Sequence, residues 1–250
     1  FDFIRIWIRI YPVPNNRRNG MIKTFVFDLG NTLIEYPEPE KLQENCLKFS
    51  AIMKTDRDLL GMMQKNLKED RRSGLETHSE ATVEAALSRA LGSGGSRYCE
   101  ADKKFILEEI YRFGFGLHAS PVPGASCVLQ ELRRRGYKLG IVSNTPFPGE
   151  FFRRDLERFG LLQYFQVLVW SSEFGKRKPS PDIFHKALKD LGVSPEEAVY
   201  DGDKFDRDVA GSRGAGMHPV WFDRNDRGKD YVGHRIQLLS ELMNIREFFV

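Results

Sequence analysis

The feature that most constrains the fold is a regular alternation of strand-like and helix-like segments after Pro121. Short β-rich apolar runs alternate with longer segments whose apolar residues have helical spacing. This alternation is typical of a parallel sheet covered by helices on both faces, and the ligands of such sheets bind beyond the carboxyl ends of the strands. The expected helices are 124–136, 149–160, 181–192 and 206–216, and the expected strands are 22–28, 137–143, 166–170, 198–203 and 218–222.

A long helical segment separates the first strand from the rest of this pattern. Residues 37–118 are rich in Lys, Glu and Leu, and we expect four helices there. Thr77 and Glu80 have the spacing of a capping box, in which two residues satisfy backbone N–H groups at a helix start, and they predict a helix over residues 81–91. The predicted division is a core of residues 21–36 and 119–250 with a helical domain, 37–118, inserted into it.

Residues 1–20 differ from both parts. Isoleucines occupy every second position from Ile4 to Ile10, which is the periodicity of a strand and not of a signal peptide. The chain starts at Phe1, and Met21 directly precedes the first core strand. We therefore expect residues 1–20 to be translated upstream sequence outside the native protein. A membrane-surface anchor and an extra edge strand are the alternatives.

Charge and cysteine content exclude several classes of protein. The formal net charge is +3, and four arginines and one aspartate within residues 1–20 account for that excess. The remaining chain is balanced, so we expect no nucleic-acid partner. The three cysteines lack metal-binding spacing, which favours reduced packing thiols. Because no apolar run approaches the roughly 20 residues that span a bilayer, we expect a cytoplasmic enzyme without a membrane partner.

Polar residues capable of catalysis or ligand binding lie in four short segments, each at the end of a predicted strand or just after one. Taken singly, each has an ordinary interpretation as a turn residue, a helix cap or a solvated loop charge. Taken together, they place a nucleophile, a hydroxyl, a lysine and a pair of carboxylates at one edge of the predicted sheet. These residues are Asp28, Ser143, Asn144, Lys178, Asp203 and Asp208.

The same segments resemble the four motifs of the haloacid dehalogenase superfamily, in the family's order. The motifs are FVFDLGNTL, GYKLGIVSN, the lysine of RKPSPDIF, and YDGDKFDRDVAGSRGAGM, and the resemblance covers residues 22 to about 240. It implies a Rossmann-like, doubly wound parallel sheet in three layers, α/β/α. The helical insert resembles the C1-type cap of subfamily I. Such a cap closes over the site and excludes water and polymers, which implies a small phosphorylated metabolite as substrate. We expect the protein to be a monomer or a homodimer.

The resemblance also implies roles for individual residues. Asp28 resembles the family's nucleophile, and an ionised carboxylate can attack phosphorus to form an acyl phosphate. The implied cofactor is Mg²⁺, which prefers hard oxygen ligands. Its implied ligands are Asp28, Asp203, Asp208 and the backbone carbonyl of Gly30. Lys178 and Ser143 are implied to stabilise charge on the phosphoryl oxygens, and Leu29, Gly30, Asn31 and Asn144 to bind the phosphate.

One position departs from the family's pattern. Most phosphatases of the family carry a second aspartate two residues after the nucleophile, and this acid protonates the leaving alcohol; here the residue is Gly30. Acid–base assistance typically contributes ~10²–10⁴ in rate. Glu35 and Asp201 are candidates to replace it, or the substrate itself handles the proton. Family members that resemble sugar-phosphate hydrolases also carry Gly here. We expect a phosphatase that favours leaving groups needing little protonation.

Two other interpretations stay open at this point. The first is different chemistry within the family, namely dehalogenation or phosphonate cleavage. Dehalogenases of the family resemble the chain at the nucleophile, but typically carry Ser-Asn in place of Gly202-Asp203. Phosphonate-cleaving relatives need a cap lysine, for which the insert offers several. A binding or regulatory protein that has lost its acid is the second interpretation. Arg71 and Arg72 could bind a phosphate or sugar acid, or form a solvated helix face. The lysine candidates are Lys41, Lys48, Lys54, Lys65 and Lys68.

Overall fold

The structure, a computed structural model, describes residues 21–37, 57–92, 99–228 and 230–249. Within these residues the chain forms a six-stranded sheet in the order β5-β4-β1-β6-β7-β8, and every neighbouring pair of strands is parallel. The predicted parallel α/β sheet is confirmed. Residues 1–20, and the expectations about them, lie outside the described residues. The strands are β1 Thr24–Phe27, β4 Lys138–Ser143, β5 Val167–Trp170, β6 Ala198–Gly202, β7 His218–Phe222 and β8 His234–Ile236.

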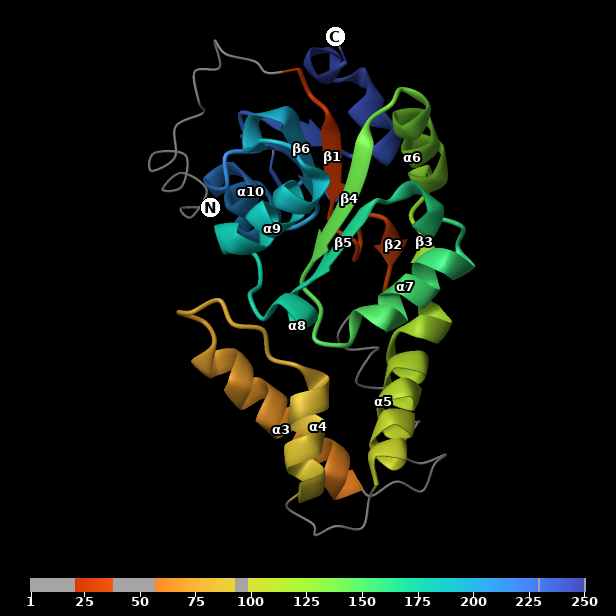
Figure 1. The fold of residues 1–250 in the computed structure, drawn as a ribbon, viewed down its shortest axis with the longest axis vertical. Helices are drawn as coiled ribbons and strands as arrows, with labels where there is room; N and C mark the ends of the chain where they lie inside the picture. The colour runs from red at the N-terminus through yellow and green to blue at the C-terminus, as the bar shows by residue number, and fades with distance from the viewer. Residues whose placement is uncertain (1–20, 38–56, 93–98, 229, 250) are drawn as a thin grey trace.

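Helices cover both faces of the sheet, which confirms the three layers (Figure 1). Side chains alternate along a strand, so Phe25 and Phe27 of β1 enter one core layer and Val26 enters the other. The first layer contains α6 (Ala125–Arg134) and α7 (Gly149–Arg158). The second contains α9 (Pro181–Leu191) and packs beside α10 (Ala210–Gly214). The sheet is thus buried on both sides, and its ligand-accessible edge is the one at the strand ends.

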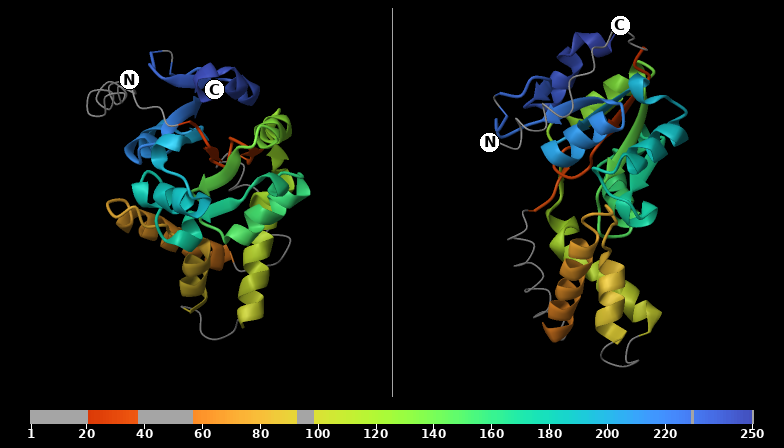
Figure 2. Two further views of the ribbon diagram at one scale, coloured as in Figure 1. Left: turned by 45° about the horizontal axis from the view of Figure 1, so that its top comes forward. Right: turned by 90° about the vertical axis from the view of Figure 1, so that its left-hand side faces the viewer.

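The helices of the insert lie beyond that edge, as Figures 1 and 2 show. They are α3 (Arg57–Ser73), α4 (Val83–Gly92) and α5 (Glu100–Gly114). A short antiparallel pair, β2 (Ile34–Glu35) and β3 (Ser120–Pro121), forms where the chain leaves and re-enters the core. The prediction of four helices extends over residues 38–56, which lie outside the described residues. Across the described part of the chain, no helix is long and apolar enough to cross a membrane.

The predicted capping box is wrong, although the helix that it announced exists. α4 begins at Val83, and the hydroxyl of Thr82 accepts a hydrogen bond from the backbone N–H of Ala85 at 3.2 Å. Thr82 therefore caps the helix. The Glu80 carboxylate instead accepts a hydrogen bond from Ser171 of the core at 2.6 Å. A local pattern was overridden by a contact between residues far apart in sequence.

The predicted helix over 206–216 forms in two pieces. A π-helical turn, Phe205–Val209, precedes α10 and carries Asp208. Such turns are rare and are frequent at functional sites. Gly202 explains how Asp208 reaches the sheet edge, because a Cβ at Gly202 would lie 2.5 Å from the carboxyl carbon of Asp208. A side chain at position 202 would collide with that carboxylate.

Candidate active site

The predicted site residues meet at the carboxyl ends of three adjacent central strands. Asp28 follows β1 directly, Ser143 is the last residue of β4, and Asp203 follows β6. The register pairs Phe27 with both Ile141 and Asp201, so the three strands end side by side. This places the nucleophile implied by the family resemblance between a hydroxyl on one side and a carboxylate on the other.

Lys178 joins this group from the loop between α8 (Ser171–Phe174) and α9. Its Nζ lies 2.7 Å from Asp28 Oδ1, 2.6 Å from Asp208 Oδ1 and 2.8 Å from the hydroxyl of Tyr200. Ser143 Oγ donates to the same Asp28 oxygen at 3.0 Å. The lysine side chain is only 2% exposed, and its three N–H donors are all engaged. The ammonium thus lies within hydrogen-bonding distance of Asp28, the predicted nucleophile.

The electrostatics follow from burying several charges together. Burial alone would lower the pKa of Lys178, but the charges of Asp208 and Asp28 raise it. Burial raises the pKa of Asp208 to about 7; Lys178 opposes this shift, while Asp28 and Asp203 add to it. Burial and the charge of Asp28 likewise raise the pKa of Asp203. Without a further positive charge, these carboxylates repel one another.

The carboxylates can hold a metal ion. Asp28, Asp203 and Asp208 are all buried, and each offers an oxygen within 4.8 Å of the others. Three hard oxygen donors at this spacing suit a divalent cation, and the repulsion among them is what such a cation would relieve. The close approach of Asp208 that Gly202 permits is part of this arrangement. Nothing in the geometry tests the carbonyl of Gly30, which stays a predicted ligand.

The predicted phosphate-binding residues have varied surroundings. Asn144 holds the main chain of Lys178, because its side chain donates to Lys178 O at 3.0 Å and accepts from Lys178 N at 2.7 Å. The N–H of Asn31 donates to Ile34 O at 2.7 Å, so this donor already has a partner. Asn31 has a positive φ of 60°, a conformation that Asn tolerates in tight turns. Phosphate binding by Asn144 and by the loop from Leu29 to Asn31, including Gly30, remains a prediction.

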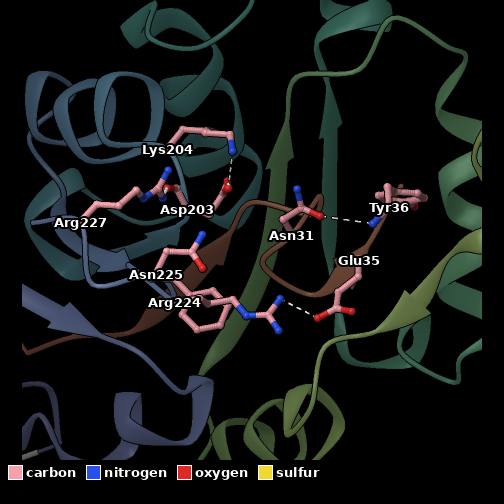
Figure 3. A pocket seen from close by; sticks show the side chains of 9 residues that line it. Asn31, Glu35, Tyr36, Asp203, Lys204, Arg224, Asn225 and Arg227 are labelled. Carbon is pink, nitrogen blue, oxygen red and sulfur yellow. Dashed lines mark hydrogen bonds and ion pairs between the residues drawn. The ribbon is translucent and has the colours of Figure 1, made fainter. Parts of the chain in front are cut away.

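A cavity of about 430 Å³ opens beside Asp203 (Figure 3). Glu35 lies in its wall and forms an ion pair with Arg224 at 2.6 Å. Asp203 forms an ion pair with Lys204 at 2.7 Å. The basic residues of this wall were not predicted from the sequence. Arg224 nevertheless lies just beyond the carboxyl end of β7, the kind of position from which Asp203 was predicted. The residues lining the cavity are Asn31, Glu35, Tyr36, Asp203, Lys204, Phe222, Arg224, Asn225 and Arg227.

The two candidates for the missing acid occupy different environments. Asp201 is fully buried in β6, and burial raises its pKa well above the usual range. Its carboxyl oxygens have no hydrogen-bond partner among the residues that the structure describes. Glu35, by contrast, faces the cavity. Of the two, only Glu35 lies where a substrate could contact it.

The structure describes some, but not all, of the insert lysines and arginines that are candidates for substrate binding or catalysis. Lys65 and Lys68 are exposed on α3, while Lys41, Lys48 and Lys54 lie outside the described residues. Partial desolvation lowers the pKa of Arg71, and the neighbouring carboxylate of Glu80 opposes this shift. Arg71 therefore lies near the contact between the insert and the core, although both Arg71 and Arg72 are exposed on α3.

Residues 22–216 of the sequence match the family model of the haloacid dehalogenase-like hydrolases. The chain belongs to the haloacid dehalogenase-like hydrolases. The predicted family and the prediction of a hydrolase are both confirmed. The match contains Asp28, Ser143, Lys178, Asp203 and Asp208, so every charged residue of the buried cluster lies inside the family domain.

Named relatives of this haloacid dehalogenase-like hydrolase include phosphatases. Glyceraldehyde 3-phosphate phosphatase of Methanopyrus kandleri is 32% identical over 219 residues, covering 84% of this chain and 86% of the relative. The enzyme of that name from Methanocaldococcus jannaschii is 29% identical, covering 90% and 97%. Phosphoserine phosphatase of Thermus thermophilus is 41% identical over 109 residues, which are 43% of each chain.

Solved structures agree with this placement. A HAD phosphatase from Thermococcus onnurineus has a TM-score of 0.57 and 29% identity, with 90% of this chain and 98% of that chain covered. A 2-haloacid dehalogenase from Pseudomonas syringae has a TM-score of 0.69 at 24% identity, covering 92% and 100%. The second likeness shows the shared fold alone, and it does not favour dehalogenase chemistry for this chain.

Proposed function

We propose that this hydrolase is a Mg²⁺-dependent phosphatase that cleaves a small phosphorylated metabolite through an aspartyl-phosphate on Asp28. The observation that carries the proposal is the convergence of Asp28, Lys178 and two further carboxylates in one buried cluster at the sheet edge. The relatives named as phosphatases of three-carbon phosphates and of phosphoserine support a small phosphate ester as substrate. A cavity of about 430 Å³ is consistent with a ligand of that size.

The proposed chemistry has two displacements at phosphorus. A carboxylate oxygen of Asp28 attacks the phosphoryl group, the bond between phosphorus and the ester oxygen breaks, and an acyl phosphate forms on Asp28. Water then attacks that phosphorus, releasing inorganic phosphate and restoring the carboxylate. Lys178 and Ser143, already bonded to Asp28, stabilise charge on the transferring oxygens.

The proposed metal ligands are Asp28, Asp203, Asp208 and the carbonyl of Gly30. When bound, Mg²⁺ would supply positive charge that neutralises the phosphoryl oxygens and orients the phosphate toward the nucleophile. Lys204 forms an ion pair with Asp203 in the structure, and this pair competes with a metal for the same carboxylate. The chain's own contribution is to hold three carboxylates close together in a buried site.

Mg²⁺ should stabilise the folded protein, and more so at higher pH. A carboxyl with a higher pKa in the folded than in the unfolded state makes folding favour the proton. Asp208, with its pKa raised to about 7, therefore makes the metal-free protein lose stability as pH rises from about 4 to about 7. Metal competes with that proton. We expect the rise in melting temperature on adding Mg²⁺ to be small near about pH 5.5 and large near about pH 8.

The control for this experiment is Asp203→Asn, which removes one proposed ligand and should reduce the Mg²⁺-dependent rise at both pH values. When the free Mg²⁺ concentration is about a hundredfold above its dissociation constant, binding should raise the free energy of unfolding by about 2.7 kcal/mol. An equal rise in melting temperature at both pH values, unaffected by the substitution, would place the metal elsewhere.

Restoring an acid at position 30 should broaden the range of substrates. The site has room for it, because a Cβ at Gly30 would meet only Tyr36 Cδ2, at an ordinary distance of 3.8 Å. We expect wild type to cleave aryl or acyl phosphates well and alkyl phosphates slowly. Gly30→Asp should raise kcat/KM for alkyl phosphates by roughly 10- to 100-fold, with Gly30→Ala as the matched control. A wild-type rate independent of leaving-group pKa, with chemistry rate-limiting, would contradict this explanation.

Phosphate release from a panel of phosphorylated metabolites, measured with Mg²⁺ and with a chelator, tests the proposed function directly. We expect turnover of at least one small ester with Mg²⁺ and none after chelation. Folded, metal-binding protein that releases phosphate from no ester would favour a binding role instead.

A further inference from the structure

A short segment of the helical insert is paired with the chain that leads to Lys178. Residues 77–80 lie against residues 175–177 of the core. The N–H of Arg177 donates to His78 O at 2.8 Å, and the N–H of Glu80 donates to Gly175 O at 3.1 Å. An isolated antiparallel bridge joins Ser79 to Lys176 between these bonds. The contact is thus made by backbone groups on both sides, which hold the two segments in one register.

The side chain of Glu80 anchors this pairing. It is 2% exposed, accepts a hydrogen bond from Ser171 Oγ at 2.6 Å, and lies 3.7 Å from a guanidinium nitrogen of Arg177. A buried carboxylate is unfavourable unless it is hydrogen-bonded and paired. The hydroxyl and the cation both come from the core. The carboxylate therefore keeps these partners only while the insert is docked.

From Ser171 the contacts continue to the active site. Ser171 Oγ accepts from the N–H of Thr145 at 2.8 Å. The preceding residue, Asn144, holds both the N–H and the carbonyl of Lys178. Ser143, one residue earlier, donates to Asp28. Glu80, the end of β4 and the loop that carries Lys178 are thus linked by hydrogen bonds to the adjacent residues 143–145.

The backbone at the contact has an uncommon conformation. His78 has a φ of +52°, in the left-handed region that residues with a side chain seldom adopt. Such residues persist where surrounding contacts fix them, and they cluster at functional sites. Here the carbonyl of His78 is the acceptor for Arg177, one residue before Lys178.

We propose that Glu80 is a positioning residue for Lys178, which couples docking of the insert to placement of the Lys178 ammonium beside Asp28. Glu80 does not touch the reacting atoms. It acts by fixing the segment from Ser171 to Arg177, and with it the main chain of Lys178. The proposal rests on the proposed function in one respect, namely that Lys178 acts on the phosphoryl group.

Two measurements on wild type, Glu80→Ala, Glu80→Gln and Glu76→Ala test the coupling. Glu76 is an exposed glutamate that lies just before this segment, and it serves as the matched control. The first measurement is backbone hydrogen exchange at Arg177 and Lys178. The second is kcat and KM for an aryl phosphate with Mg²⁺. This ester is small enough to be cleaved without contacting the insert.

In Glu80→Ala we expect exchange at Arg177 to be about tenfold faster while protection in β1 is retained. We expect kcat to fall roughly ten- to a hundredfold with a smaller change in KM, because the ammonium is misplaced. Glu80→Gln, which keeps an acceptor for Ser171, should recover part of both effects, and Glu76→Ala should match wild type.

Unchanged exchange and kcat in Glu80→Ala would overturn the proposal. So would faster exchange that extends equally to β1 and β6, since that pattern reports a general loss of stability. If wild type releases phosphate from no ester, the proposed function fails by itself. The exchange at Arg177 then still decides whether Glu80 fixes the Lys178 segment.

Discussion

Replacing Asp28 with Asn should abolish phosphate release from every ester while the protein stays folded. The amide cannot form the acyl phosphate, and removing one member of a catalytic unit costs at least about 10⁴-fold in rate. The fold should survive, because Asp28 contributes to the repulsion that raises the pKa of Asp203 and of Asp208. Steady-state turnover and the melting temperature, measured on the same preparation, give both results.

Asp190→Asn is the matched control for that substitution. Asp190 is an exposed aspartate of α9 that forms an ion pair with Lys186 on the same helix, and its replacement should change neither turnover nor folding appreciably. Retention of turnover in the Asp28 variant would refute covalent catalysis at this residue. Unfolding of that variant would show instead that the carboxylate is needed to balance Lys178.

Replacing Lys178 with Met should reduce both activity and stability. The ammonium lies within 2.7 Å of Asp28 and 2.6 Å of Asp208, and its removal leaves two buried carboxylates without their cation. Breaking a buried pair in this way typically costs about 3–5 kcal/mol of unfolding free energy. A cation that stabilises a transferring phosphoryl group is worth roughly 10³–10⁵ in rate. Denaturant unfolding and kcat measure the two effects separately.

Mg²⁺ should restore part of the lost stability of the Lys178 variant but little of its activity. The metal replaces the missing positive charge near the carboxylates, whereas it cannot reproduce the donor bonded to Asp28. Lys189→Met, at an exposed position on α9, is the control and should behave as wild type. A Lys178 variant as stable as wild type without metal would mean that the carboxylates are protonated in the resting protein.

The strand-end residues could be located from the sequence because they obey a periodic rule. Strands such as 22–28 and 198–203 can be predicted from their apolar, β-rich composition, and parallel strands bring the residues at their carboxyl ends to one edge of the sheet. Asp28 and Asp203 come directly after β1 and β6, and Ser143 is the last residue of β4. Lys178 lies in a loop without such periodicity, and only the family motif pointed to it.

The contacts between the insert and the core could not be read in this way. Glu80 has the spacing of a capping residue, yet its carboxylate accepts a hydrogen bond from Ser171, which lies 91 positions away in the sequence. From the sequence, Tyr200 is an ordinary buried strand residue, yet its hydroxyl accepts a hydrogen bond from Lys178. Both depend on tertiary packing, which the order of residues along the chain does not encode locally. Arg224 was within reach of the strand-end rule and was overlooked.

The full hydrogen-bonding complement of Lys178 has a consequence for affinity. An ammonium has three protons, and Asp28, Asp208 and Tyr200 already accept all of them in the resting protein. If the ester binds Lys178 as proposed, it must displace one of these internal partners, and the loss of that hydrogen bond reduces the net binding free energy of the ester. The same exchange runs backwards when the product departs, since the internal oxygens re-form their bonds. Free inorganic phosphate should consequently be a weak inhibitor of this hydrolase.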